Sequence, residues 1–283
     1  MSVKMLVAVV GGGPAGVSCA AFLKRYNVDV VIYEKRTIGG LIENAWFVEN
    51  FPLVEPAPGE FLVEKFRNIV KENNIDIVYD EIFKITKREN YGNDGKIKLV
   101  GKNNVYFSDI VVIATGTKPK RIEKFEISNR IVYEFRDLPK DAKNIAFYGG
   151  GDVSFDGAIK NAMRGNSSTV FVRGNKIKAV PKLVKEVERL GIPVRINDEI
   201  LNVESKNSID DKIIVETSKG RYTFDALLIA IGRLENRPEI ENVEIGKEVY
   251  IIGDVAHVDF RQSSIAIGDG VKCAMEILKK IEI

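Results

Sequence analysis

The sequence contains few residues of the kinds that carry redox and metal chemistry. Among its 283 residues are two cysteines, Cys19 and Cys273, and one histidine, His257, and there is no Cys-x-x-Cys pair. This usage excludes a disulfide scaffold and a thiolate metal site, and it fits a reducing cytoplasm. We expect no metal centre, and we expect both cysteines to be buried packing residues, with a disulfide between them as the alternative.

Long apolar runs and excess charge are also lacking. No apolar run approaches the roughly 20 residues that a membrane-spanning helix needs. The apolar run at residues 5–10 leads directly into a glycine turn, which favours a buried strand over a signal peptide. Lys and Arg total 42 against 40 Asp and Glu, so neither nucleic acid nor a membrane is the expected partner. A single glutamine, Gln262, among plentiful Lys, Glu and Ile is typical of a thermophile.

The N-terminal pattern is a strand, a glycine turn, a helix and a second strand. The continuous apolar run MLVAVV predicts a parallel strand buried on both faces, and Pro14 begins a helix that should reach about Arg25. The second strand, VDVVIYE, ends at Glu34. This order is the context that a dinucleotide-binding turn requires.

The turn itself, GGGPAG, carries the pattern G-x-G-x-x-G at Gly11, Gly13 and Gly16. The first glycine allows a tight turn, the second lets the backbone approach a pyrophosphate, and the third allows the helix to pack closely on the strand. The helix N-terminus offers N–H groups and the positive end of its dipole to the anion. Glu34 follows Gly11 by 23 residues, where a carboxylate accepts hydrogen bonds from ribose hydroxyls. We predict a dinucleotide site here.

The same order of elements recurs from residue 144. The strand NIAFY leads into a second turn, GGGDVS, followed by a helix and the strand STVFVR. The patterned positions of this turn are Gly149, Gly151 and Ser154. Arg173 stands 24 residues after Gly149, where the first copy has an acid. An arginine attracts a 2′-phosphate that a carboxylate would repel, so Arg173, with Lys176 and Lys178 just beyond, favours NADPH over NADH. The alternative is that these are ordinary solvated cations.

The remaining periodic segments complete two similar halves, which end alike in IVVIATG and ALLIAIG. Further helices are expected at 60–73, 181–190 and 262–281. Further strands are expected at 75–79, 82–87, 96–100, 104–107, 193–198, 202–206, 212–218 and 248–254, with YGNDG at 91–95 as a hairpin turn. Because ALLIAIG already closes the second half, the strand at 248–254 most simply completes the first sheet.

These patterns predict an α/β fold of two Rossmann-like nucleotide-binding domains, the second inserted into the first. Each domain is expected to have three layers, two of β-sheet and one of helices (ββα). The first domain is expected to comprise residues 1–116 and 233–283, and the second residues 117–232.

The segments GGGPAG, IGGL, FVENFP, VIATG, GGGDVS, AIG, GDVAHVDFRQ and AIGDGVKCA, in this order, resemble the thioredoxin reductase family of flavoproteins across essentially the whole chain. The resemblance implies a homodimer with FAD in the first domain and NADPH in the second. It places the ADP half of FAD at Gly11, Gly13, Pro14, Ala15, Gly16, Glu34 and Lys35, and the adenine at the backbone of Ile82. It places Gly39, Gly40, Leu41 and Asn50 along the flavin, and it has Ala114, Thr115 and Gly116 close over the cofactor. It places Asp254, which follows Gly253, at the ribityl or phosphate region. It places the second nucleotide at Gly149, Gly151, Asp152, Val153, Ser154, Arg173 and Lys178.

By the same resemblance, Arg261, Gln262 and the helix that begins at Ser263 would face the pyrimidine end of the flavin. A helix N-terminus aimed there would stabilise the negative charge that reduced flavin gains. The alternative is that these residues are simply a capped helix start.

The chain departs from that family where the reactive disulfide would lie. Thioredoxin reductases carry Cys-x-x-Cys just before the second glycine turn, whereas this chain has IVYEFRDLP at 131–139. We therefore expect no dithiol chemistry. The segments VYEFRDL and GGGDVSFDGA are similar to the thioredoxin-reductase-like ferredoxin–NADP reductases, whereas FVENFP and FRQ look more like true thioredoxin reductases.

The NADPH signature of the family is altered as well. Its H-R-R-x-x-x-R aligns with Val172-Arg173-Gly174-x-x-x-Lys178, so one cation is lost and another is a lysine. Losing one charge-assisted contact costs about 1.5–3 kcal/mol, which weakens the case for NADPH.

The sequence therefore predicts an FAD-dependent oxidoreductase that moves electrons between NAD(P)H and an acceptor such as ferredoxin, with no side chain as an obligatory catalyst. Two alternatives remain: a non-catalytic FAD-binding paralogue with impaired NADPH binding, and a reductase of small-molecule disulfides or quinones.

His257 is expected to be a solvated loop residue, with proton transfer as the alternative. A basic cluster is either a solvated face or a docking surface for an acidic electron carrier; it comprises Lys118, Lys120, Arg121 and Lys124.

Overall fold

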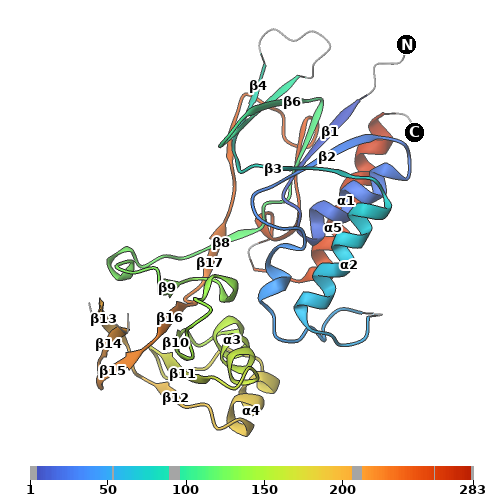
Figure 1. Cartoon of the computed structure of the whole chain (residues 1–283). Coiled ribbons are helices and arrows are strands. Elements are labelled where there is room, and N and C mark those ends of the chain that lie inside the picture. Colours follow the sequence, from blue (N-terminus) through green and yellow to red (C-terminus); the bar gives the residue numbers. More distant parts are fainter. Residues whose placement is uncertain (1–4, 53, 89–95, 206–211, 258, 282–283) are drawn as a thin grey trace. The chain divides into compact units, whose positions relative to one another are not determined.

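The computed structural model describes residues 5–52, 54–88, 96–205, 212–257 and 259–281, and the chain divides into two compact units (Figure 1). Unit 1 comprises residues 1–43, 49–118 and 234–283, and unit 2 comprises residues 44–48 and 119–233. Each unit is built on a parallel sheet, so the fold is α/β with two Rossmann-like units, as the sequence predicts. The hairpin turn expected at 91–95 lies outside the described residues.

The central sheet of unit 1 has five parallel strands in the order β19-β7-β1-β2-β3. Their bounds are β1 Leu6–Val10, β2 Asp29–Glu34, β3 Asp76–Tyr79, β7 Ile110–Ile113 and β19 Val249–Ile251. The innermost strands, β1 and β7, are apolar on both faces because both faces are covered. β19 pairs with β7 at the edge, which confirms that the last strand completes the first sheet.

Helices cover one face of this sheet and a second sheet covers the other. The helices are α1 Pro14–Lys24, α2 Gly59–Glu72 and α5 Ser263–Lys280, and the covering sheet, in the order β18-β4-β5-β6, comprises β18 Glu239–Glu241, β4 Ile82–Lys87, β5 Ile97–Gly101 and β6 Val105–Ser108. Alternate residues of β1 enter the two cores: Val7 and Val9 lie on the helix side, and Ala8 and Val10 on the sheet side. The unit is therefore the expected three-layer ββα sandwich.

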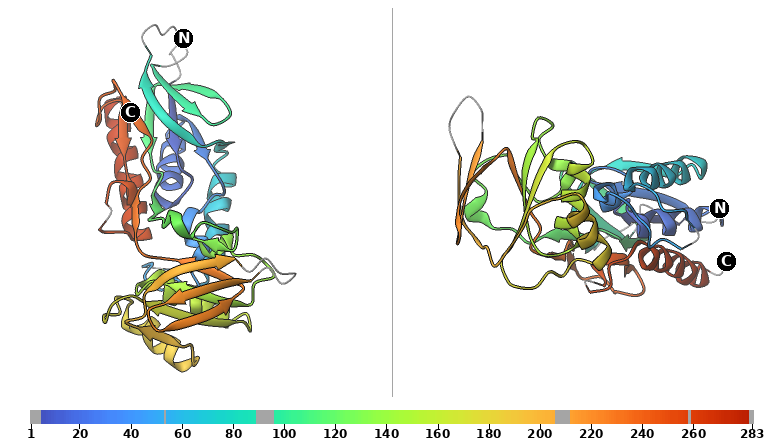
Figure 2. Two further views of the ribbon diagram at one scale, coloured as in Figure 1. Left: turned by 90° about the vertical axis from the view of Figure 1, so that its left-hand side faces the viewer. Right: turned by 90° about the horizontal axis from the view of Figure 1, so that it is seen from below.

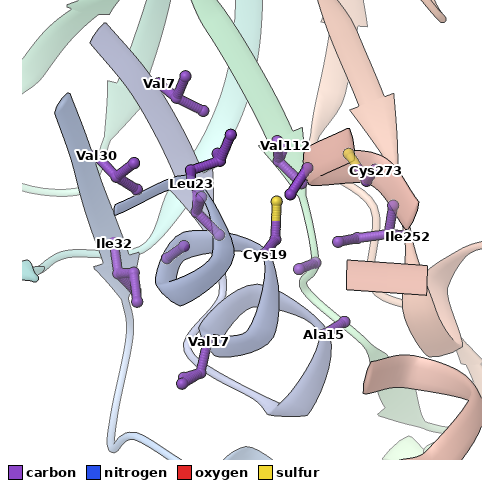
Figure 3. Close-up of a cluster of buried hydrophobic side chains, with 14 of the residues drawn as sticks. Val7, Ala15, Val17, Cys19, Leu23, Val30, Ile32, Val112, Ile252 and Cys273 are labelled. Carbon is purple, nitrogen blue, oxygen red and sulfur yellow. The ribbon is translucent and has the colours of Figure 1, made fainter. Parts of the chain in front are cut away.

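Helices α1 and α5 pack closely side by side (Figure 2). The approach depends on Gly270, because a Cβ there would lie 2.3 Å from the Ala15 carbonyl oxygen. Cys19 of α1 and Cys273 of α5 lie in the same buried cluster, and both thiols are free (Figure 3). A hydrogen bond with Cys273, together with burial, raises the pKa of the Cys19 thiol well above its usual value. The two cysteines are therefore packing residues, as expected, and not a disulfide.

Unit 2 has the same three-layer architecture as unit 1. Its parallel sheet has the order β12-β11-β10-β16-β9, with β9 Ile131–Val132, β10 Asn144–Tyr148, β11 Ser167–Val172, β12 Val194–Ile196 and β16 Ala226–Ile229. The helices on one side are α3 Asp152–Ala162 and α4 Pro181–Arg189, and the antiparallel sheet on the other is β13 Ile200–Ser205, β14 Ile213–Thr217 and β15 Gly220–Phe224. Phe147 enters the helix-side core, and Ala146 and Tyr148 enter the sheet-side core.

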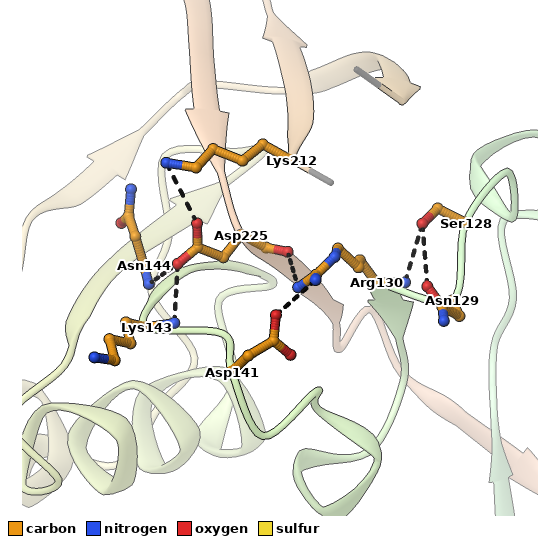
Figure 4. Close-up of polar contacts among 8 residues, drawn as sticks. All are labelled: Ser128, Asn129, Arg130, Asp141, Lys143, Asn144, Lys212 and Asp225. Carbon is orange, nitrogen blue, oxygen red and sulfur yellow. Dashed lines mark hydrogen bonds and ion pairs between the residues drawn. The ribbon is translucent and has the colours of Figure 1, made fainter. Parts of the chain in front are cut away.

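Asp225 fixes the start of β10 beside β16 (Figure 4). Its Oδ2 accepts the backbone N–H groups of Lys143 at 2.9 Å and Asn144 at 2.8 Å. The ammonium of Lys212 lies 3.8 Å from its Oδ1. Arg130 donates to the carbonyl of Asp225 at 3.4 Å and also binds the carboxylate of Asp141 at 2.6 Å. These contacts set the register of the closing strand.

Several short elements were not expected from the sequence. They are β8 Thr117–Pro119, β17 Arg233–Glu235, β9, β18 and the single turns η1 Gly40–Asn44, η2 Glu123–Phe125, η3 Phe135–Asp137 and η4 Gly253–Val255. The connecting strands β8 and β17 pair with each other. Within the described ranges, no helix has the length and apolar character needed to span a bilayer.

Candidate functional site

The first glycine turn joins β1 to α1 with almost no space beneath it. Gly11 has a φ of 110°, and a Cβ added there would lie 2.4 Å from the carbonyl oxygen of Ala114. A Cβ at Gly16 would lie 1.9 Å from the carbonyl oxygen of Gly11. Gly13, by contrast, has no atom within 4 Å of an added Cβ. The turn is therefore tightly packed at Gly11 and Gly16 and open at Gly13, just before Pro14 begins α1.

A buried carboxylate holds this turn in place. Glu34, at the end of β2, is 8% exposed, and its Oε2 accepts the N–H of Gly12 at 2.7 Å. Its Oε1 accepts the N–H of Arg36, also at 2.7 Å. Each oxygen keeps a second lone pair for a ribose hydroxyl. The link between Glu34 and Gly12 is a contact that the sequence did not reveal.

The chain after β2 folds back over the turn. Gly39 donates its N–H to the carbonyl of Gly12 at 2.8 Å, and an added Cβ at Gly40 would lie 3.3 Å from the Cα of Gly13. Gly39 and Gly40 have φ values of 102° and 62°, which explains why two glycines stand here. Leu41 follows in η1 and is half-buried.

Residues 114–116 lie beside the turn at the end of β7. Ala114 donates its N–H to Val10 at 2.8 Å. The hydroxyl of Thr115 is buried and finds no hydrogen-bond partner among the described residues. Asn236 donates its backbone N–H to Gly116 at 3.0 Å and its side-chain amide to the carbonyl of Thr115 at 3.3 Å. Asn236 is a neighbour of the site that no sequence signal pointed to.

The start of α5 is a further part of the candidate site in unit 1. Asn50 donates from Nδ2 to Oε1 of Gln262 at 2.6 Å, so two residues that the resemblance assigns to the flavin are in contact. Gln262 precedes Ser263, the first residue of α5, and this helix start has no side-chain cap. Its first N–H groups thus remain available to an acidic ligand edge. Arg261, just before, is exposed.

The other assigned residues of unit 1 are spread around these segments. Gly253 begins η4 and its N–H binds Oδ2 of Asp269 at 3.0 Å, and Asp254 is half-buried. Ile82, the first residue of β4, is buried. Lys35 points to the surface, where its ammonium lies 3.2 Å from Oε1 of Glu81 and its side chain is 42% exposed.

These features fit an extended dinucleotide. The open space above Gly13, the unpartnered hydroxyl of Thr115 and the buried carboxylate of Glu34 lie along one path over the carboxyl end of the sheet. FAD is the group that the resemblance implies for this path.

The second turn has the same backbone form but different packing. Gly149 has a φ of 151°, and Gly151, which caps α3, has no atom within 4 Å of an added Cβ. Ser154 stands where the first turn has Gly16; it is fully buried, and its hydroxyl has no partner among the described residues. Asp152 begins α3 and accepts the N–H of Val180 at 2.9 Å, whereas Val153 is exposed.

The loop after β11 closes over this turn through its own backbone N–H groups. The N–H groups of Lys178 and Ala179 donate to the carbonyl of Gly150 at 2.6 Å and 3.0 Å. The side chains of Arg173 and Lys178 are exposed. This arrangement brings the assigned cations to one rim of the turn.

The segment in place of the family disulfide forms part of the core of unit 2. Val132 and Phe135 are buried, and Glu134 is 8% exposed. Glu134 pairs with Arg233 at 2.9 Å and accepts a hydrogen bond from Nδ2 of Asn44 at 2.8 Å. The segment therefore has a structural role, and it contains no cysteine.

His257 and the basic cluster make local contacts. Nε2 of His257 lies 3.1 Å from Oδ2 of Asp269, the carboxylate that also holds Gly253. Arg121 pairs with Glu126 at 2.6 Å, and Lys124 donates to the carbonyl of Leu201 at 3.2 Å. Among the described residues no group of His, Cys, Asp and Glu could hold a metal ion.

Comparison with known proteins gives a consistent result. A family model described as pyridine nucleotide-disulphide oxidoreductase matches residues 5–270. The chain is 27% identical to the ferredoxin–NADP reductase of Ignicoccus hospitalis, over 86% of this chain and 83% of that protein. It is 25% identical to the "34.2 kDa protein in rubredoxin operon" of Clostridium pasteurianum, over 96% of each. The crystal structure of T. acidophilum thioredoxin reductase has the same fold, with a TM-score of 0.83, 22% identity and 98% of both chains covered.

Proposed function

The chain belongs to the pyridine nucleotide-disulphide oxidoreductase family, and from that premise we propose that it is an FAD-dependent oxidoreductase. In this proposal it takes electrons from NAD(P)H and passes them on without a protein disulfide. The observation that carries the proposal is the buried Glu34 carboxylate bound to Gly12 beneath the open position at Gly13. The segment at 131–137, built into the core of unit 2, supports the absence of a dithiol step.

Bound FAD would supply the redox chemistry, because a flavin can accept the two electrons of a hydride and can release electrons one at a time. The chain's own residues would bind and orient it. Glu34 would accept the ribose hydroxyls, the N–H groups at the start of α1 would bind the pyrophosphate, and the start of α5 at Gln262 would stabilise negative charge on the ring. No side chain is required as a catalyst.

Unit 2 would bind the pyridine nucleotide. The N-terminus of α3 behind Gly151 would face its pyrophosphate, with Asp152, Val153 and Ser154 forming the first turn of that helix. Arg173 and Lys178 would lie at its adenosine end.

The acceptor in this proposal is ferredoxin or another one-electron carrier. Two relatives support it: one is named ferredoxin–NADP reductase, and the other is named for a rubredoxin operon. Acidic carriers would be attracted by a basic face such as that around Lys120 and Arg121. We also propose that the protein is a homodimer, which light scattering on the purified protein would test.

The deciding experiment is an anaerobic titration of the purified protein with NADPH and with NADH, following the flavin absorbance. Loss of the oxidised-flavin band with either nucleotide supports the proposal, and a screen of acceptors that begins with ferredoxin would follow. If dithionite reduces the flavin and neither nucleotide does, the proposal is wrong.

That negative outcome would favour a second candidate, a non-catalytic FAD-binding paralogue. The altered phosphate signature supports this candidate, because Gly174 stands where the family has a cation.

A further inference from the structure

In unit 2, the end of β11 lies against the residues that follow β12. Asn197 donates its N–H to Gly174, and Asp198 donates its N–H to Val172, both at 3.1 Å. These two bonds enclose Arg173, which lies between the two acceptors. Arg173 is therefore placed beside a segment that contains two consecutive acids, Asp198 and Glu199.

Tyr148 relates this segment to the glycine turn. It directly precedes Gly149, is 5% exposed, and its hydroxyl accepts the N–H of Ile200. Burial raises the pKa of Tyr148, the charge of Glu199 raises it further, and Arg173 lowers it. The carboxylate of Glu199 and the guanidinium of Arg173 thus act on the same hydroxyl, one residue before the turn.

The two acids are held rigidly. Glu199 donates its N–H to the hydroxyl of Ser218 at 3.1 Å, and its carbonyl accepts the N–H of Ser218 at 2.9 Å. Asp198 is fully buried, and its Oδ1 accepts the Ser218 hydroxyl at 3.3 Å. Its Oδ2 has no partner among the described residues. Both acids therefore belong to the segment whose backbone binds the end of β11 on either side of Arg173.

We propose that Glu199 determines the nucleotide specificity of unit 2, so that the site takes NADH in preference to NADPH; this rests on the proposed function. A half-buried carboxylate accepts hydrogen bonds from ribose hydroxyls and repels a 2′-phosphate. The usual acid of an NAD site stands at the end of the second strand of the unit, where this chain has Arg173. Here the acid comes from the connection that follows the next strand, β12, so counting from the glycine turn does not find it.

The test is calorimetric titration of the FAD-loaded protein with NAD⁺ and with NADP⁺. We expect NAD⁺ to bind the unaltered protein at least about tenfold more tightly, since one opposing charge near a phosphate has about that effect. Glu199→Gln should reduce this ratio by roughly tenfold, mainly through tighter NADP⁺ binding. Glu199 is held through its backbone, so the variant should fold. Glu216→Gln, an exposed acid on β14, is the matched control and should leave the ratio unchanged.

Tighter binding of NADP⁺ by the unaltered protein, or an unchanged ratio in Glu199→Gln, would overturn this inference and leave the proposed function standing. Failure of both nucleotides to bind would overturn the proposed function, and the inference with it. A second variant, Arg173→Met, should weaken NADP⁺ binding and affect NAD⁺ by less than about threefold.

Discussion

The two glycine turns of this molecule share a backbone form and differ in how they are supported. The first turn has no room for a side chain at Gly16 and is bound by the buried acid Glu34. The second turn contains Ser154 at the same position, is held by backbone hydrogen bonds, and presents the exposed cation Arg173. The acid-bound turn is suited to a cofactor that stays bound, and the turn beside exposed cations to a nucleotide that comes and goes.

One acid of each unit also shows the difference: Glu34 is buried and Asp156 is half-buried. In unit 1 the carboxylate of Glu34 accepts two backbone N–H groups. In unit 2 the carboxylate of Asp156 on α3 accepts one, from Trp46 at 2.7 Å, and burial raises its pKa to about 6. The single N–H bond to Asp156 does not offset the cost of burying its charge.

The largest expected effect is that of Gly16→Ser, which gives the first turn the residue found in the second. Its Cβ would lie 1.9 Å from the carbonyl oxygen of Gly11. We expect unit 1 to lose about 3 kcal/mol or more of stability and the protein to be purified without FAD. Denaturant unfolding and the flavin content of the purified protein measure this. A yellow variant with an unchanged unfolding midpoint would show that the two turns are equally tolerant.

The second prediction concerns pH. Because the pKa of Asp156 is about 6 in the folded state and 3.8 in the reference state, the folded state binds the proton more tightly. The protonated Asp156 therefore stabilises the folded state at low pH. This contribution to the free energy of unfolding is complete below about pH 4, is lost as the pH rises through about 6, and amounts to about 3 kcal/mol. Asp156→Asn keeps an acceptor for Trp46 and should remove this pH dependence. Unfolding in denaturant between pH 4 and 7 tests it.

The control for that experiment is Asp141→Asn. Arg130 lowers the pKa of the exposed Asp141, so any stability from this pair is lost as the pH falls, which is the opposite sign. If Asp156→Asn retains the full pH dependence, Asp156 is not its source.

The third prediction removes the acid that binds the first turn. In Glu34→Gln the side-chain amide would face at least one of the N–H groups that the carboxylate now accepts. An unsatisfied buried donor costs about 1–3 kcal/mol, so FAD should bind tens of times more weakly. Equilibrium dialysis of FAD measures this, with Glu81→Gln as a control whose carboxylate is 52% exposed. Equal loss of FAD in both variants would mean that burial of Glu34 is irrelevant.

The smallest expected effect is a gain in the stability of unit 2. Ser154→Ala removes a buried hydroxyl that has no partner among the described residues and should stabilise unit 2 by about 1 kcal/mol. Ser168→Ala is the opposite case, because the Ser168 hydroxyl donates to Ala158 and accepts from Asn161, both at 3.0 Å. Thermal unfolding should move up in the first variant and down in the second. Two shifts of the same sign would contradict this.

Most of the fold could be predicted from the sequence because its signals are local. Continuous apolar runs predicted β1, β7, β10 and β16. The glycine turns after β1 and β10 predicted the starts of α1 and α3. The short strands β8, β9, β17 and β18 could not be predicted, since none of them lies in a longer apolar run of the kind that predicted the equally short β19. Pairing with distant strands, such as β18 with β4, defines them instead.

The candidate site was only partly predictable for the same reason. Spacing from a glycine turn pointed to Glu34, because the helix between turn and acid has a nearly fixed length. Glu199 follows β12 and Asn236 follows β17, so their distances along the chain from the glycine turns carry no signal.

The sequence by itself determined that there are two nucleotide-type units and that no dithiol lies before the second turn, because these depend on residue identity and short-range order. The tertiary structure alone decided that Glu34 binds the turn, that the thiols of Cys19 and Cys273 meet as free groups, and that two acids border Arg173. Each of these is a contact between elements far apart in the chain. Such contacts are set by how layers pack and strands pair, which residue order alone does not specify.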